Sequence, residues 1–147
     1  MACDGAARGN PGPAGIGAVV ADADGRVLAE IAEGIGVATN NVAEYRAAIA
    51  GLERSAALGG RRILLRSDSR LLVEQLQGHW RVKNPTLIAL HTEARRLAKG
   101  FDSVGYEHVP RELNKHADRL ANQGVDEWLR GPGKGYASPT AGQGLFG

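Results

Sequence analysis

The hydrophobic residues of this chain change their spacing from a strand pattern to a helix pattern as the sequence proceeds. Residues 15–21 form an apolar, β-branched run bounded by glycine, which predicts a strand. Residues 22–25 end in Asp-Gly, a pair that readily takes positive φ, and therefore predict a hairpin turn. Residues 26–34 predict the returning strand. Together with a first strand that ends at Asp4, these segments predict an antiparallel meander.

Helices and strands alternate after this meander. Thr39, Asn40 and Asn41 offer helix N-caps, and the apolar residues that follow are spaced three and four apart, which predicts an amphipathic helix. The remaining predicted elements are a strand at 63–65, a short helix at 69–77, a helix that begins at Asn84-Pro85, a strand at 103–109 and a last helix capped by Asn114. This order predicts an α/β fold with a five-stranded mixed sheet, an antiparallel meander followed by parallel strands, and helices on both faces.

Composition limits the class of protein. The 147 residues are 43% hydrophobic and 23% charged, which is typical of one soluble globular domain. A single cysteine, Cys3, excludes a disulfide framework and a cysteine-based zinc site. No apolar run is long enough to span a membrane, and the first residues do not form a signal peptide, so we expect a cytoplasmic protein. The glycine- and proline-rich end predicts a folded domain at 1–129 and a flexible tail or linker stub at 130–147.

The net charge of +2 averages two unlike halves. Residues 1–60 contain four Lys/Arg and seven Asp/Glu, a balance of −3, whereas residues 61–147 contain fourteen and nine, a balance of +5. An acidic half beside a basic half would suit a metal site next to a phosphate-binding surface. A scatter of solvated charges would give the same totals.

Four acidic residues stand at the ends of predicted elements, where loops gather and functional sites are built. Asp4 ends the first strand, Glu44 lies in the first turn of the first long helix, Asp68 follows the strand at 63–67 and Asp118 lies in the first turn of the last helix. If these ends converge, four carboxylates share a pocket and need cations, because like charges raise one another's pKa. Oxygen ligands select Mg²⁺ or Mn²⁺. Individually, these acids could simply complement helix dipoles or end strands.

Four motifs around these acids resemble type 1 ribonuclease H. They are DGAARGNPGPAGIGA at 4–18, TNNVAEY at 39–45, SDS at 67–69 and NKHADRLAN at 114–122. They occur in the family's order, and the resemblance extends from about residue 1 to residue 125. It is strongest to the bacterial and archaeal subgroup that lacks a basic protrusion. The resemblance implies the ribonuclease H-like fold for the domain at 1–129.

The resemblance also implies a metal-dependent endonuclease that cleaves the RNA strand of RNA–DNA hybrids and leaves 5′-phosphate and 3′-hydroxyl ends. In the family, the acids that match Asp4, Glu44, Asp68 and Asp118 hold two Mg²⁺ ions, for which Mn²⁺ is a possible substitute. One ion helps to generate hydroxide from water, and the other stabilises the leaving 3′ oxygen. We expect Arg111 to stand where many relatives carry a mobile histidine. An arginine there would bind phosphate but could not shuttle protons near neutral pH.

The resemblance also implies which residues touch the hybrid. The sequence predicts a glycine-rich loop at 5–17 whose backbone approaches the RNA minor groove, although a tight turn would have the same composition. The helix N-terminus at Thr39 is a ready anion site. Trp80 and its cationic neighbours would lie along the DNA backbone, unless Trp80 instead fills the core. The candidate substrate-binding residues are Gly5, Arg8, Asn10, Thr39, Asn40, Asn41, Arg70, Trp80, Lys83 and Asn114.

Two other functions are compatible with the sequence. One is a hybrid- or RNA-binding module of the same fold that has no turnover. The other is the nuclease half of a bifunctional ribonuclease H/phosphatase, with the glycine-rich tail as the junction. We expect a monomer with no obligate protein partner. Because only three residues precede Asp4, we also expect a short first strand and lower thermal stability than in a version extended by a few apolar residues.

Overall fold

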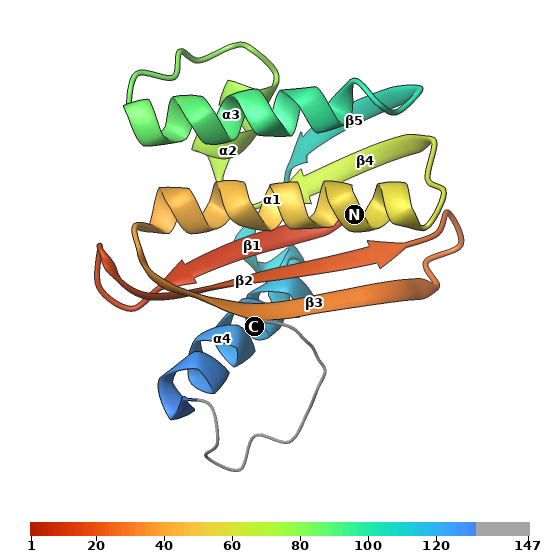
Figure 1. The fold of residues 1–147 in the computed structure, drawn as a ribbon. Coiled ribbons are helices and arrows are strands. Elements are labelled where there is room, and N and C mark those ends of the chain that lie inside the picture. The colour runs from red at the N-terminus through yellow and green to blue at the C-terminus, as the bar shows by residue number, and fades with distance from the viewer. Residues whose placement is uncertain (132–147) are drawn as a thin grey trace.

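A five-stranded mixed sheet forms the centre of the computed structural model, which describes residues 1–131 (Figure 1). The strand order across the sheet is β3-β2-β1-β4-β5. The strands are β1 (Ala2–Ala7), β2 (Gly12–Ala21), β3 (Val27–Ala38), β4 (Arg62–Ser67) and β5 (Ser103–His108). The first three strands pair antiparallel, whereas β4 is parallel to both β1 and β5. The predicted meander followed by parallel strands is confirmed.

Helices cover both faces of this sheet. They are α1 (Asn40–Ala57), α2 (Arg70–Leu76), α3 (Pro85–Ala98), the 3₁₀ helix η1 (Arg111–Leu113) and α4 (Lys115–Arg130). Figure 1 shows α1 across the near face of β1–β3 and α4 on the far side. The core between the sheet and α1, α2 and α3 is aliphatic, with Leu52, Leu65 and Leu72 fully or almost fully buried. None of the helices in the described part combines the length and apolar character needed to cross a membrane.

The glycines between residues 5 and 17 correct one expectation, because most of this segment is sheet and only residues 8–11 form a turn. A Cβ on Gly5 would lie 2.3 Å from the carbonyl carbon of Ala43 on α1. A Cβ on Gly17 would lie 2.2 Å from the carbonyl oxygen of Ala117 on α4. Glycine inside a strand often marks such a close approach of another backbone. These glycines therefore bring two helices onto opposite faces of the sheet.

The starts of the helices agree with most of the predicted caps. The Thr39 hydroxyl oxygen accepts a hydrogen bond from the backbone N–H of Val42 at 3.2 Å, and Asn84 caps α3 in the same way. Two expectations were wrong. Glu44 lies in the second turn of α1 because the helix begins at Asn40, and the Asn114 side chain makes no capping bond to α4.

The last described helix reaches past the predicted domain boundary. Helix α4 includes Arg130, one residue beyond the predicted domain end at 129. Of the predicted tail, residues 132–147 lie outside the described residues.

Candidate active site

Three of the four predicted acids meet beside β1 and β4, although the expectation that the first strand ends at Asp4 was wrong, because β1 continues to Ala7. Asp4 lies within β1, Asp68 directly follows the neighbouring strand β4, and Glu44 projects from α1, which packs on β1. One carboxylate oxygen from each residue lies within 4.8 Å of those of the other two. Asp4 is 5% exposed and Glu44 6% exposed, so two of these charged groups are removed from bulk water. We call Asp4, Glu44 and Asp68 the acidic trio.

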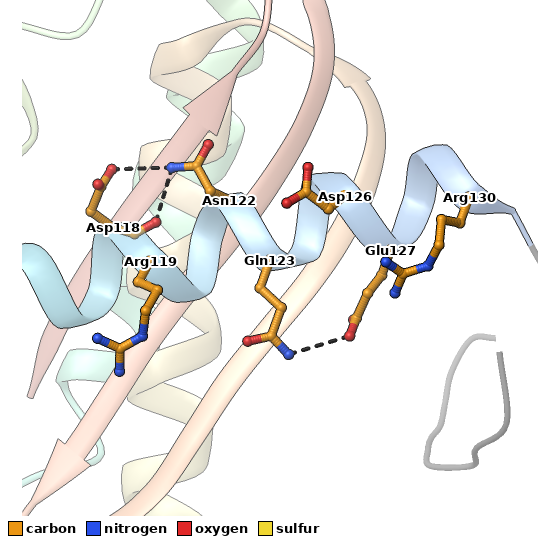
Figure 2. Close-up of a pocket in the computed structure, with 7 residues that line it drawn as sticks. All are labelled: Asp118, Arg119, Asn122, Gln123, Asp126, Glu127 and Arg130. Atoms are coloured by element: carbon orange, nitrogen blue, oxygen red, sulfur yellow. Dashed lines mark hydrogen bonds between the residues drawn. The ribbon is translucent and has the colours of Figure 1, made fainter. Parts of the chain in front are cut away.

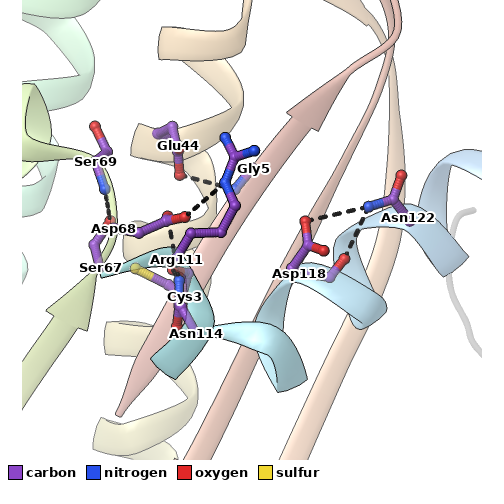
Figure 3. Close-up of polar contacts among 10 residues, drawn as sticks. All are labelled: Cys3, Gly5, Glu44, Ser67, Asp68, Ser69, Arg111, Asn114, Asp118 and Asn122. Carbon is purple, nitrogen blue, oxygen red and sulfur yellow. Dashed lines mark hydrogen bonds and ion pairs between the residues drawn. The ribbon is translucent and has the colours of Figure 1, made fainter. Parts of the chain in front are cut away.

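Hydrogen bonds from backbone N–H groups position Glu44 and the turn that carries Asp68. The N–H of Gly5 donates a buried hydrogen bond of 2.8 Å to Oε1 of Glu44 (Figure 3). This bond requires α1 to lie close to β1, which the missing side chain of Gly5 allows. After β4, the Ser67 hydroxyl oxygen accepts from the N–H of Ser69 at 3.0 Å and stabilises the turn that carries Asp68. This role of Ser67 was not predicted, although Ser67 stands in the SDS motif.

Asp118 lies beside the acidic trio rather than within it. Its carboxylate accepts a hydrogen bond of 3.3 Å from the side-chain amide of Asn122, one turn later on α4 (Figure 3). The Asp118 carboxylate is nevertheless close enough to Asp4 to contribute, by hydrogen bonding and by its charge, to the raised pKa of that residue. The structure therefore brings three predicted acids together and places the fourth next to them.

Burial sets the electrostatics of the trio. Desolvation raises the pKa of Asp4, and the negative charges of Glu44 and Asp68 raise it further. Burial also raises the pKa of Glu44, and the hydrogen bond from Gly5 opposes part of this shift. Without a bound cation, the carboxyl groups of Asp4 and Glu44 tend to keep protons. Divalent cations bound to their oxygens would replace those protons, so the donor set fits a hard cation such as Mg²⁺.

Asn114 and Arg111 both contact Asp68 (Figure 3). Asn114 is 2% exposed, and its Nδ2 donates to the backbone oxygen of Cys3 at 3.0 Å and to Oδ1 of Asp68 at 3.3 Å. We expected the side chain of Asn114 to contact substrate, but its amide instead orients the carboxylate of Asp68. Nε of Arg111 lies 3.7 Å from Oδ2 of Asp68, and the side chain is 85% exposed. Arg111 thus presents a positive charge to solvent at the rim of the trio.

The turn between β1 and β2 joins two other parts of the site. Oδ1 of Asn10 accepts from the N–H of Asn40 at 2.9 Å, which ties the turn to the start of α1, where Asn40 and Asn41 are exposed. The guanidinium of Arg8 instead reaches α4, where it pairs with Asp126 at 2.7 Å and donates to Oδ1 of Asn122 at 3.2 Å. We expected Arg8 to contact substrate, but its guanidinium already forms an ion pair and a hydrogen bond within the protein.

A shallow depression follows the exposed side of α4. Figure 2 shows its lining from Asp118 at one end to Arg130 at the other, and its volume is about 440 Å³. The side chains of Asn122 and Asp126 that contact Arg8 belong to this lining. The depression therefore leads from the fourth acid toward the end of α4.

The Trp80 segment lies at the surface, between α2 and α3. Trp80 is 44% exposed, so the alternative in which it fills the core is wrong. The guanidinium carbon of Arg70 lies 5.9 Å from the centre of the indole ring, within the range of a cation–π contact. Lys83 is exposed on the same segment.

Known proteins that are similar to this chain belong to one family. Residues 2–124 match a family model described as "Reverse transcriptase-like". The chain is 49% identical over 124 residues to ribonuclease HI from Halobacterium salinarum, a match that covers 84% of this chain and 62% of that protein. The chain belongs to the type 1 ribonuclease H family. This ribonuclease H chain spans less than two thirds of that relative and 34% of the "Bifunctional protein Rv2228c" of Mycobacterium tuberculosis, to which it is 54% identical over 124 residues.

Solved ribonuclease H structures share the fold. The RNase H1 of Halobacterium salinarum superposes with a TM-score of 0.84 at 48% identity, covering 86% of this chain and 96% of that chain. The amino-terminal RNase H domain of Rv2228c gives 0.83 at 54% identity, over 84% and 95%. LC11-RNase H1, solved in complex with an RNA/DNA hybrid, gives 0.83 at 41% identity, over 87% and 96%.

Proposed function

We propose that this chain is an endonuclease that hydrolyses the RNA strand of RNA–DNA hybrids and leaves 5′-phosphate and 3′-hydroxyl ends. The observation that carries the proposal is the acidic trio, whose carboxylate oxygens converge within 4.8 Å in a chain of the ribonuclease H family. The hybrid bound by LC11-RNase H1, a structural neighbour at 41% identity, supports the choice of substrate.

We propose that Asp4, Glu44, Asp68 and Asp118 hold two Mg²⁺ ions, with Mn²⁺ as a possible substitute. The support is chemical: all four donors are carboxylates, and at two of them burial and neighbouring charge disfavour ionisation unless a cation is present. When bound, such ions make a hydroxide available from water and stabilise the negative charge on the leaving oxygen.

The protein's own groups orient the acids and the substrate. Gly5 holds Glu44 through its N–H, and Asn114 holds Asp68 through its amide. Arg111 stands at the solvent-facing rim with a permanent charge, so its proposed role is to bind a phosphate of the substrate. The turn that bears Asn10 and the start of α1 lie side by side and offer polar groups to the hybrid.

The relative named "Bifunctional protein Rv2228c" supports a related arrangement, in which the nuclease domain belongs to a longer protein with a second activity. We also propose that the ribonuclease domain acts as a monomer in the cytoplasm. Sedimentation equilibrium of the purified chain tests the first point, and cell fractionation tests the second.

The nuclease activity is tested with an end-labelled hybrid, supplied with Mg²⁺ or Mn²⁺ and with or without EDTA. The wild-type chain should cut only the RNA strand, and EDTA should abolish cleavage. Asp68→Asn should lower the rate by more than about a hundredfold. The control Asp102→Asn alters an exposed acid that pairs with Arg61, and should leave the rate unchanged. Hybrid binding without cleavage under either metal would favour the binding-module alternative.

A further inference from the structure

A buried amide on α2 has no part in the site described so far. Gln75 is 5% exposed, and burying an unpaired amide is costly, so its partners indicate its purpose. Its Oε1 accepts a hydrogen bond of 2.6 Å from the hydroxyl of Tyr45. Its Nε2 donates at 3.1 Å to the backbone oxygen of Arg81. Tyr45 directly follows Glu44 on α1, so Gln75 connects the helix of the acidic trio with the segment between α2 and α3.

The direction of these hydrogen bonds is determined by chemistry. The backbone oxygen of Arg81 can only accept, so the Nε2 of Gln75 must face it. A reversed amide would place two acceptors against each other. The remaining amide atom, Oε1, can only accept, so the hydroxyl of Tyr45 donates to it. The buried amide is therefore fixed in one orientation.

A third helix completes the arrangement. Nε2 of His91 on α3 lies 3.0 Å from the backbone oxygen of Gln75, and its ring meets Tyr45 edge-on at 6.3 Å between centroids. The contacts of Gln75 and Tyr45 thus connect α1, α2 and α3.

The segment that Gln75 holds has no regular secondary structure, but it is anchored at several points. The N–H of Trp80 donates to the backbone oxygen of Glu74 at 3.2 Å, and Val82 packs against the core. The side chains of Trp80, Arg81 and Lys83 are exposed, and Arg70 lies against the Trp80 ring. We call residues 80–83 the tryptophan platform. Its combination of an aromatic ring with cations suits a nucleic-acid strand, on which it can stack and pair with phosphates.

We propose that Gln75 is a positioning residue that, together with Tyr45, holds the tryptophan platform in its binding conformation before the hybrid arrives. The proposal rests on the proposed function, because it names the hybrid as the ligand of the platform. A segment ordered in advance does not lose conformational entropy on binding. Loss of Gln75 should therefore weaken hybrid binding and leave the chemical step at the acidic trio unchanged.

The test compares Gln75→Met, which keeps the length of the side chain and removes both hydrogen bonds, with Gln77→Met, an exposed glutamine next to the same helix. At a temperature where both variants are folded, Gln75→Met should raise KM and the hybrid Kd about tenfold and change kcat by less than about twofold. Gln77→Met should change none of these values. A fall in kcat at unchanged KM would overturn the proposal.

A double-mutant cycle tests whether Gln75 acts through the platform. Trp80→Ala should weaken binding strongly in the wild type and much less in the Gln75→Met background. Independent, multiplicative losses would contradict the proposal. Tyr45→Phe leaves the hydrogen bond from Gln75 to Arg81 in place. It should therefore weaken hybrid binding less than Gln75→Met does. A general destabilisation of the core by Gln75→Met would not produce this graded loss of affinity.

Fluorescence provides a readout that does not depend on cleavage. The chain has two tryptophans, so a Trp128→Phe background leaves Trp80 as the sole reporter. Gln75→Met should lower the anisotropy of Trp80 in the free protein, and adding a non-cleavable hybrid should restore it. Unchanged anisotropy in the free protein would refute pre-ordering. If the wild type binds the hybrid without cutting it, the proposed function fails while this measurement still decides the role of Gln75.

Discussion

Asn122 donates its side-chain amide to the carboxylate of Asp118, one helical turn earlier on α4, at 3.3 Å. The amide oxygen of the same residue accepts from Arg8, which stands in the turn between β1 and β2. Asn122 therefore connects the fourth acid with a turn that we expect to contact substrate. Neither Asn122 nor this connection was predicted, although a spacing of four residues on a helix is the spacing at which side chains meet.

Asn122→Ala should reduce the apparent affinity for Mg²⁺, because the Asp118 carboxylate would lose the group that orients it. Groups that orient metal ligands typically contribute about 10–100-fold to metal affinity or activity. The measurement is the Mg²⁺ concentration at half-maximal rate, together with the heat of Mn²⁺ binding to the free protein. Gln123→Ala, one residue further on α4, is the control. An unchanged Mg²⁺ midpoint in Asn122→Ala would show that Asp118 is positioned by other contacts.

Gly5→Ala should destabilise the protein and impair the site together. The new Cβ would lie 2.3 Å from the backbone of α1, so the helix that carries Glu44 must move. We expect a loss of about 3 kcal/mol or more in the free energy of unfolding, measured with urea. Gly105→Ala on β5 is the matched control, because its Cβ would meet Leu64 at an ordinary distance of 3.6 Å. Equal urea midpoints for Gly5→Ala and Gly105→Ala would show that α1 does not depend on glycine at position 5.

The metal-free protein should lose stability as the pH rises. The pKa values of Asp4 and Glu44 are raised above their ordinary values of 3.8 and 4.5, so the folded state keeps protons that the unfolded state releases. The stability linked to these protons is complete below about pH 4 and decreases progressively above it. In EDTA, unfolding at pH 8 should require roughly 1–3 kcal/mol less than at pH 5.

The variant Asp4→Asn tests the origin of this pH dependence. It removes one titrating group, so its stability should fall less between pH 5 and pH 8 than that of the wild type. Added Mg²⁺ should stabilise the wild type at pH 8 and have a much smaller effect on the variant. Parallel pH profiles for the two proteins would exclude Asp4 as a source of the effect.

Arg111→Ala should weaken hybrid binding with little change in stability, because the side chain is 85% exposed. If the guanidinium contacts one phosphate, the slope of log Kd against log salt should become shallower by about one. Arg111→Lys should restore most of this slope, since it keeps the charge. Arg62→Ala, an exposed cation at the start of β4, serves as the control. An unaltered salt slope in Arg111→Ala would argue against a phosphate contact.

Local chemistry explains why much of the fold could be predicted. Thr39 and Asn84 act through backbone groups two or three residues away, so their caps could be predicted from short motifs. The order of strands and helices followed from changes in hydrophobic spacing. Strand β4 ends directly before Asp68, as its apolar run indicated.

The errors concern contacts between distant parts of the chain. Gly5 and Gly17 belong to a glycine-rich segment whose composition is typical of a loop. Only the close packing of α1 and α4 shows why the strands carry glycine at these two positions. Asn114 stands at a cap position, but the oxygens of Cys3 and Asp68 bind its amide instead. The convergence of the trio depends on β1 lying beside β4, which spacing along the sequence cannot establish.

The central place of β1 determines when the site can form during synthesis. β1 leaves the ribosome before the other strands of the sheet, yet its parallel partner β4 and the helix α4, which packs against Gly17 of β2, follow much later. A growing chain therefore cannot complete the trio until Asp68 has emerged, and it lacks the fourth carboxylate until α4 has been made. Contacts so distant in sequence also slow folding, because long loops must close before they form. The newly made domain thus completes its proposed cation-binding centre as one of the last steps of its assembly.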